Sequence, residues 1–384
     1  MQPTEPKLSR RNCIPIIYTR GTHYEVGFDV GRTFSGLIHS FLEQAESLPK
    51  FLEAYSSPAG KNSYHETLEN LKIDFPQYVK ELEGIADGAK VSFHKLFLLH
   101  MDDIILAAAQ KKPTSDLPTG CSTICVNHED QELLGHTEDA LAATLNHYYF
   151  VSAHIISDQP QGKWGVQEEK FTSLCYAGHL PGYTMNYNHH GLVFSVNTLC
   201  AKRLKPGKTP RHFIARALLA TRNFSESLEI MQNSGGGAGD GCSFNVTFLK
   251  EPGKFYNIEM APTLTDQGDE SELDVMLIDS GNYSYHANSY LHLKSEETNK
   301  HMIDSSVARL EAFNTYPIPK TEEDLRKMLS DQSHLIHPVF RDQHSQYVKT
   351  ICVGIFNIKK KTWSLYADNP KENKPLVVLP IEVQ

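Results

Sequence analysis

The chain changes character near residue 120, and this change limits the folds that it can adopt. From Tyr24 to about Lys112 the apolar residues recur at helical spacing, whereas beyond Gly120 short runs rich in β-branched and aromatic residues predict strands. The predicted strands are 122–126, 145–156, 192–196, 243–249, 255–259, 350–358 and 362–366, and the predicted later helices are 212–232, 305–313 and 322–329. Because the strands come in antiparallel-looking groups, without a strict alternation of strand and helix, we expect an α+β layered core rather than a doubly wound parallel sheet.

Charge and composition exclude several classes of protein. The 384 residues include 37 basic and 46 acidic side chains, so the net charge of −9 offers no basic footprint for nucleic acid or an anionic membrane surface. No run approaches the roughly 20 apolar residues of a membrane helix, and residues 1–12 carry no apolar signal region. The seven cysteines are an odd, scattered set, which is typical of reduced thiols. We therefore expect a cytoplasmic globular protein without nucleic-acid or membrane partners.

Several common catalytic motifs are absent from the sequence. The chain has no G-x-S-x-G, no H-E-x-x-H and no paired C-x-x-C. Its 19 histidines never take the spacing of a zinc site, and the glycine-rich stretch 234–241 lacks the Lys-Ser/Thr that completes a phosphate-binding loop. We expect no metal and no cofactor, and we interpret 234–241 as a turn between a helix and a strand.

The junction at 119–123 places a cysteine where a polar, proline-bearing linker meets the first predicted strand. Glycine accepts backbone conformations that other residues resist, so Gly120 would let the Cys121 thiol attack the Gly120 carbonyl carbon and open the peptide bond. The freed α-amino group, with a reference pKa of about 7.7–8, would then act as base for the thiol of the same residue. A buried linker cysteine that packs as a small hydrophobic residue explains the local sequence equally well.

Polar residues downstream of this junction fit the same chemistry. Asp139 follows Cys121 by 18 residues, at the end of the adjacent predicted hairpin strand, where a carboxylate would orient the new ammonium group. An apolar strand closes on Asn197, whose side-chain N–H suits a tetrahedral oxyanion. Asn288 ends another strand-like stretch, and Arg309 lies near a predicted helix start. Taken alone, residues such as Asn288 and Arg309 are more often capping or surface contacts.

Five segments in the same order along the chain carry a family resemblance. They are RGTHYEVGF at 20–28, GCST at 120–123, GHTED at 135–139, VNTL at 196–199 and HAN at 286–288. With them the chain resembles the penicillin acyltransferase branch of the N-terminal nucleophile hydrolases. The resemblance implies an αββα sandwich made as an inactive precursor. Cleavage between Gly120 and Cys121 would give a mainly helical chain, 1–120, and a catalytic chain, 121–384, which stay associated.

The resemblance also implies roles for single residues. Cys121 is then the nucleophile, Asp139 supports the N-terminal amine or the maturation step, and Asn197 donates to the oxyanion. Asn288 matches a polar strand asparagine of related enzymes.

The helix position of the family is open at this stage. The family's helix carries two arginines and this chain keeps one, so either Arg309 or Ser306 holds the functional position.

Further segments, at 14–27, 175–183 and 208–213, resemble the members of this branch that hydrolyse β-alanyl amides of biogenic amines. The implied partners are small β-alanyl conjugates such as β-alanyl-dopamine and carcinine, cleaved through a thioester, with a homo-oligomer also possible. Such a substrate joins a cationic amine to an aromatic leaving group, so its pocket should combine an acid with aromatic walls. Glu138 and Tyr148 are the first candidates, although the pattern of 148–150 favours a core strand.

Two other functions remain open from the sequence. The thioester could pass its acyl group to an amine, which would make the protein an N-acyltransferase. A non-catalytic binding protein of the same fold would keep an unbroken chain.

Overall fold

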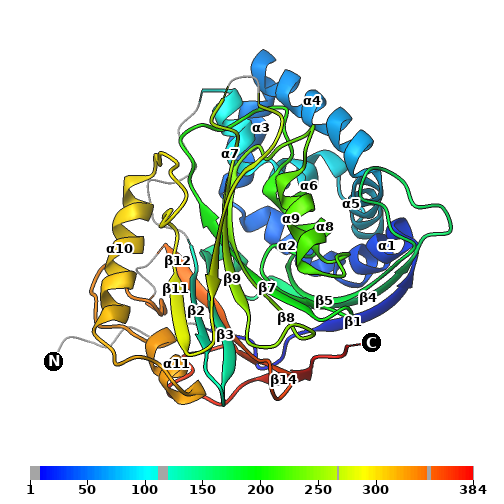
Figure 1. Ribbon diagram of the computed structural model, residues 1–384. Helices are drawn as coiled ribbons and strands as arrows, with labels where there is room; N and C mark the ends of the chain where they lie inside the picture. The colour runs from blue at the N-terminus through cyan, green and yellow to red at the C-terminus, as the bar shows by residue number, and fades with distance from the viewer. Residues whose placement is uncertain (1–8, 111–119, 266–267, 344–346, 384) are drawn as a thin grey trace.

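Two β-sheets lie against each other in this protein, and helices cover the outer side of each sheet (Figure 1). The structure is a computed structural model that describes residues 9–110, 120–265, 268–343 and 347–383. This four-layer αββα arrangement confirms the expected α+β fold. Among the described residues no helix combines the length and the apolar character needed to cross a membrane.

The larger sheet has eight strands in the order β1-β4-β5-β6-β7-β8-β9-β10. They are β1 (Ile16–Gly21), β4 (Tyr148–Ile156), β5 (Glu168–Tyr176), β6 (Met185–Asn188), β7 (Leu192–Leu199), β8 (Gly241–Phe248), β9 (Phe255–Ala261) and β10 (Glu272–Ile278). The smaller sheet has six strands, in the order β11 (Asn282–His286), β2 (Ser122–Asn127), β3 (Glu132–Leu141), β12 (Val348–Asn357), β13 (Thr362–Tyr366) and β14 (Val377–Pro380). All seven predicted strands are present, together with the predicted hairpin strand that carries Asp139 (β3) and the strand-like stretch before Asn288 (β11). Strands β1, β5, β6, β10 and β14 were not predicted.

Strand β4 shows why strands of this protein appear in the sequence as continuous apolar runs. Tyr148 and Phe150 pack in the core between the two sheets, whereas Tyr149 and Val151 pack against the helices. Successive side chains of a strand point to opposite faces, so both faces of this strand are buried. A strand buried on both faces carries few polar residues, which is the pattern that the sequence presents.

Nine helices of the described residues belong to the layer over the larger sheet. They are α1 (His23–Thr33), α2 (Ser35–Gln44), α3 (Ser47–Ser56), α4 (Pro58–Asp74), α5 (Pro76–Ala89), α6 (Phe93–His100), α7 (Asp102–Ala108), α8 (Arg211–Leu218) and α9 (Phe224–Gln232). The mainly helical N-terminal third is therefore confirmed. Helices α10 (Lys300–Asn314) and α11 (Glu322–Leu329) lie on the smaller sheet.

The prediction of one helix over 212–232 is wrong. The chain breaks between α8 and α9, and Asn223 begins the second helix by accepting a hydrogen bond from the backbone N–H of Glu226 at 3.0 Å. An asparagine at this position satisfies a backbone donor that has no partner inside the helix, so it favours a new helix start over continuation.

The N-terminal segment is built into the same fold as the rest of the chain. Strand β1 is the first strand of the larger sheet and pairs in parallel with β4. A buried charge network then joins α1 and α5 to β5 and α8. Arg216 donates to Glu81 (Nη2 to Oε2, 2.7 Å) and to Glu169 (Nη1 to Oε2, 2.8 Å). His23 lies 2.9 Å from Glu81 and 3.3 Å from Glu169, so two residues on each side of position 120 share one network.

Candidate active site

Cys121 lies directly before β2 and faces a cavity that both sheets and the helical layer enclose. The side chain is 5% exposed, so its sulfur is reached through the cavity and not from the open surface. The second strand of the hairpin, β3, carries Glu138 and Asp139 along the same wall. The hairpin therefore brings a thiol and two carboxyl groups together, as the sequence predicted for Asp139.

Gly120 has a conformation that only glycine tolerates well. Its φ is +133°, and a Cβ at this position would lie 2.1 Å from Oδ1 and 2.4 Å from Nδ2 of Asn288. Other residues meet both backbone strain and a steric clash here. Gly120 thus has the kind of conformation that the sequence analysis considered, one that other residues resist.

Two side chains hold the carbonyl group of Cys121. Arg309 Nη1 donates to this oxygen at 2.8 Å, and Asn197 Nδ2 donates to it at 3.1 Å. Arg309 Nη2 also donates to Asn288 Oδ1 at 2.7 Å, and Asn288 Nδ2 donates to the carbonyl oxygen of Thr198 at 2.9 Å. The structure thus brings the predicted residues Asn197, Asn288 and Arg309 to one point.

The structure also separates the two candidates for the helix position. Arg309 is fully buried and contacts Cys121 directly, whereas the Ser306 hydroxyl accepts a hydrogen bond from the backbone N–H of Asn288 at 3.0 Å. Arg309 therefore contacts Cys121, whereas Ser306 contacts Asn288.

Asn197 has a different orientation from the one expected of an oxyanion donor. Its amide N–H binds the carbonyl oxygen of Cys121 itself, and its Oδ1 accepts from Thr123 and from Asn245, each at 2.8 Å. Asn197 contacts the backbone of Cys121 and is not among the residues that line the cavity. A sequence can identify an amide at the end of a strand but not the direction in which the amide points.

Asp139 has a partner that the sequence did not reveal. Its Oδ1 accepts from the Thr350 hydroxyl at 2.6 Å, and its Oδ2 lies 3.7 Å from Nε of Arg341. Burial raises the pKa of Asp139, while Arg341 and Arg309 act in the opposite direction. Arg341 lies in the loop before β12, where no helical or strand periodicity marks it.

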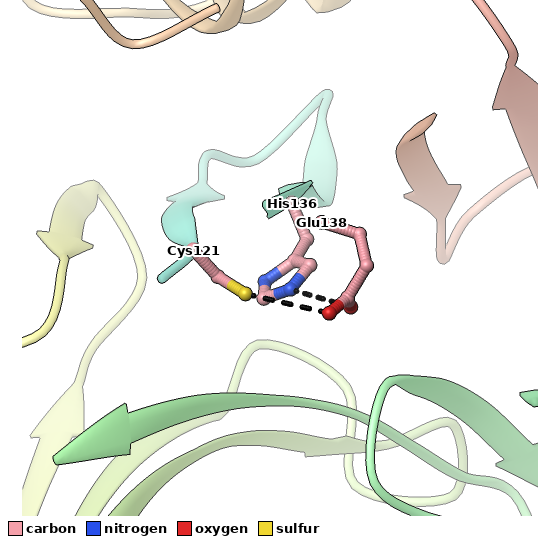
Figure 2. Close-up of side chains that lie close together, drawn as sticks. All are labelled: Cys121, His136 and Glu138. Atoms are coloured by element: carbon pink, nitrogen blue, oxygen red, sulfur yellow. Dashed lines mark hydrogen bonds and ion pairs between the residues drawn. The ribbon is translucent and has the colours of Figure 1, made fainter. Parts of the chain in front are cut away.

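Glu138 lies closer to the cysteine sulfur than the sequence could indicate. The Cys121 thiol donates to Glu138 Oε1 at 3.5 Å, and His136 Nε2 lies 3.3 Å from Oε2 (Figure 2). The Tyr176 hydroxyl donates to the same Oε1. The ligand atoms of Cys121, His136 and Glu138 all lie within 4.8 Å of one another, close enough to hold a metal ion. The resemblance predicts a nucleophile at Cys121 rather than a metal ligand, because a thiol bound to a metal ion would not be free to attack a carbonyl carbon.

The surroundings of Cys121 keep its thiol protonated. Burial is the largest cause, and Glu138 and Asp139 add to it, so the pKa of the thiol is raised well above its ordinary value. Arg309 opposes this effect, although burial and Arg341 lower its own pKa to about 10. Attack by this sulfur therefore requires a base close to it.

The cavity has a volume of about 200 Å³ and combines acids with aromatic walls. Its acids are Asp102, Asp103, Glu138 and Asp139, and its aromatic side chains are Phe41, Phe51, Tyr176, Tyr183, His179 and His212. Tyr148 is not on this wall. It packs between the sheets and donates to the carbonyl oxygen of Ile351 at 3.3 Å, which is the core-strand alternative that the sequence left open.

Comparison with known proteins identifies the family of this chain. Residues 126–372 match the family "Acyl-coenzyme A:6-aminopenicillanic acid acyl-transferase". A curated fruit-fly protein (Drosophila melanogaster) named beta-alanyl-dopamine/carcinine hydrolase is 54% identical over 379 residues, which are 97% of this chain and 98% of that protein. The solved structure of penicillin V acylase from Agrobacterium tumefaciens aligns at 12% identity with a TM-score of 0.39, covering 64% of this chain and 82% of the acylase chain.

The family match spans most of the predicted site residues discussed above. It begins five positions after Cys121 and includes Glu138, Asp139, Asn197, Asn288 and Arg309. Together with the 54% identity over nearly the full length of the curated relative, it establishes that this chain belongs to the acyl-coenzyme A:6-aminopenicillanic acid acyl-transferase family.

Proposed function

We propose that this chain is an amide hydrolase that releases dopamine or histamine from their β-alanyl amides, with Cys121 as its N-terminal nucleophile. The substrate class follows the name of the fruit-fly relative, which is 54% identical over 97% of this chain. The observation that carries the mechanism is the junction itself: a glycine with φ of +133° precedes a cavity-lining cysteine. Arg309 and Asn197 hold the carbonyl group of that cysteine.

Maturation opens the bond between Gly120 and Cys121. The thiol sulfur bonds to the carbonyl carbon of Gly120, the C–N bond breaks, and the proton of the thiol passes to the departing nitrogen, which becomes the α-amine of Cys121. Water then hydrolyses the resulting thioester, which leaves a carboxylate on Gly120 and restores the Cys121 thiol. Gly120 adopts a positive φ, and a side chain at this residue would clash with Asn288.

Turnover repeats the same chemistry on a substrate. The new α-amine accepts the proton of the Cys121 thiol, the sulfur attacks the amide carbon, and the amine returns the proton to the leaving nitrogen. Water then releases β-alanine from the thioester. In this scheme Asp139 orients the α-amine, while Asn197 and Arg309 position the nucleophile through its carbonyl oxygen.

The two chains stay together after cleavage in this proposal. The first chain supplies β1, the edge strand beside β4, and its helices form most of the layer over the larger sheet. His23 and Glu81 on this chain share buried charges with Glu169 and Arg216 on the other.

Intact mass spectrometry of the purified protein tests the cleavage. We expect wild type to give fragments 1–120 and 121–384, whereas Cys121→Ala remains one inactive chain of 384 residues. Cys200→Ala is the matched control, since Cys200 also lines the cavity but does not precede β2, and this variant should still be cleaved. An unbroken, active wild type, or a second fragment that begins elsewhere, would contradict the mechanism.

Acyl transfer to an amine is the second candidate, because the matching family is named for an acyltransferase. Wild-type protein is incubated with β-alanyl-dopamine, with and without an excess of a competing amine. Hydrolysis predicts equal amounts of β-alanine and dopamine under both conditions. A new β-alanyl amide of the added amine would instead identify a transferase.

A further inference from the structure

Glu138 is a buried carboxyl group that faces the cavity beside the nucleophile. It is 3% exposed, and its Oε1 accepts from the Cys121 thiol at 3.5 Å and from the Tyr176 hydroxyl. Its one ion-pairing neighbour among the described residues is His136, at 3.3 Å.

The other three acids of the cavity face arginines. Asp102 and Asp103 lie 2.5 Å and 3.0 Å from Arg211, and Asp139 lies 3.7 Å from Arg341. A carboxylate buried away from water is costly unless a cation or several donors offset its charge. Among these four acids, Glu138 is the one without an arginine partner in the described chain. Its neighbours are a thiol, a tyrosine hydroxyl and a histidine, so a cationic ligand at this carboxyl group would not compete with an arginine.

The orientation of Glu138 is fixed from three strands. Tyr176 of β5 donates to one oxygen, and His136 of β3 lies beside the other. The second ring nitrogen of His136 is 2.7 Å from the Thr123 hydroxyl of β2. A carboxylate held in this way loses little freedom on binding a ligand, so its position next to the sulfur is preorganised.

The distance between Glu138 and the sulfur suits a cationic acyl group. The ammonium of a β-alanyl group is three single bonds from the carbonyl carbon, or about 4 Å when extended. The attacking sulfur approaches that carbon to about 3–3.5 Å before the bond forms. A carboxylate oxygen 3.5 Å from the sulfur therefore lies within hydrogen-bonding reach of the ammonium while the carbonyl faces the nucleophile.

We propose that Glu138 binds the ammonium end of the acyl group and makes the enzyme select amides whose acyl group is positively charged. This inference rests on the proposed hydrolase function and names the residue that recognises its substrate. The proposal concerns the acyl end of the substrate alone, because the positive charge lies on the acyl group and the aromatic ring on the leaving group.

The same contact links recognition to reactivity. After burial, Glu138 is the largest cause that raises the pKa of the Cys121 thiol, ahead of Asp139, while Arg309 opposes both. An ammonium bound to Glu138 offsets this negative charge, so the thiolate forms more easily when the correct acyl group is present. A neutral acyl group leaves the carboxylate facing the sulfur and should react more slowly as well as bind more weakly.

Two substrates of equal length test the proposal: β-alanyl-dopamine and butyryl-dopamine, in which a methyl group replaces the ammonium. Wild type should favour the charged substrate in kcat/KM by about 10- to 100-fold, the range expected for a hydrogen bond to a charged group. Glu138→Gln should lose most of this preference, because the charged substrate loses its partner while the neutral substrate no longer meets a carboxylate beside the sulfur. Glu138→Asp keeps the charge and should retain part of the preference.

Asp103→Asn is the matched control for the loss of a cavity carboxylate. Because Asp103 already pairs with Arg211, this variant should change both substrates alike and leave their ratio within about threefold of wild type. The assignment would be wrong if the kcat/KM ratio of the two substrates stayed at the wild-type value in Glu138→Gln. It would also be wrong if that ratio were lost in Asp103→Asn instead.

Thiol labelling provides a readout that does not need turnover. The reagents are 2-aminoethyl methanethiosulfonate, which is cationic, and propyl methanethiosulfonate, its neutral counterpart. In each case the sulfur of Cys121 bonds to the thio sulfur of the reagent and methanesulfinate leaves, which peptide mass spectrometry follows at this residue. Wild type should react about tenfold faster with the cationic reagent, and Glu138→Gln should not distinguish the two.

These measurements separate the inference from the proposed function. A wild type that cleaves both amides equally and labels equally with both reagents refutes the role of Glu138 while hydrolysis stands. A wild type that cleaves neither amide refutes the proposed function, and the labelling rates still decide whether Glu138 attracts a cation. Should Glu138→Gln fail to fold or mature, Glu138→Asp takes its place. The substrate and reagent preferences of wild type must then fall in Glu138→Asp and persist in Asp103→Asn.

Discussion

Raising the pH should weaken the buried charge network that joins the N-terminal helices to the larger sheet. This network contains His23, which is 7% exposed and lies between Glu81 and Glu169. Burial by itself lowers the pKa of His23, but Glu169 and Glu81 outweigh it and raise the pKa from 6.5 to about 9. His23 is therefore charged at neutral pH in the folded protein and largely neutral in the unfolded chain.

The structure gives both the sign and the size of the effect. Because the folded protein binds this proton more tightly, the contribution is fully present below about pH 6.5 and is lost as the pH rises through about 9. A tenfold change in proton affinity corresponds to about 1.4 kcal/mol, so the contribution is about 3 kcal/mol. The network contains two carboxylates, Arg216 and the protonated His23, so deprotonation leaves one negative charge without a partner.

Urea denaturation of wild type and His23→Gln at pH 6.0, 7.5 and 9.5 measures this contribution. The free energy of unfolding of wild type should exceed that of the variant most at pH 6.0, and the difference should shrink by about 3 kcal/mol at pH 9.5. His39→Gln is the control, because His39 contacts the backbone carbonyl of Ala89 rather than a carboxylate. A wild-type advantage that is constant with pH, or that grows as the pH rises, would refute the reasoning.

Two further variants test the junction. Gly120→Ala should slow or abolish cleavage, because its Cβ would overlap the Asn288 side chain and its φ of +133° would be strained. A time course of intact mass spectra follows the appearance of the two fragments. Cleavage at the wild-type rate would exclude the steric argument. Asn197→Ala should mature but turn over about 100-fold more slowly, since a small misplacement of a nucleophile has this effect. It should also melt at a lower temperature, because Thr123 and Asn245 each lose a buried partner, and unchanged turnover would remove Asn197 from the mechanism.

The sequence alone determined the local features of this protein. Apolar periodicity identified the helical N-terminal third, and β-branched runs identified seven strands, because both signals depend on neighbours along the chain. The requirement for glycine before Cys121 was also visible, since it concerns the backbone of one residue. Strands such as β5 and β6 were missed because they carry polar residues that their neighbours in the sheet satisfy, for example Asn186, which accepts from the Ser173 hydroxyl at 2.6 Å.

Contacts across the sheets were decided only by the tertiary structure. Arg309 reaches the carbonyl oxygen of Cys121 from 188 positions away, and no spacing rule distinguished it from Ser306. Arg341 beside Asp139 and the position of Glu138 against the cysteine sulfur depend equally on how strands pair and helices pack. The sequence shows which residues have side chains that can take part in chemistry. The direction in which each side chain points depends on strand registers and on packing, which involve the whole chain.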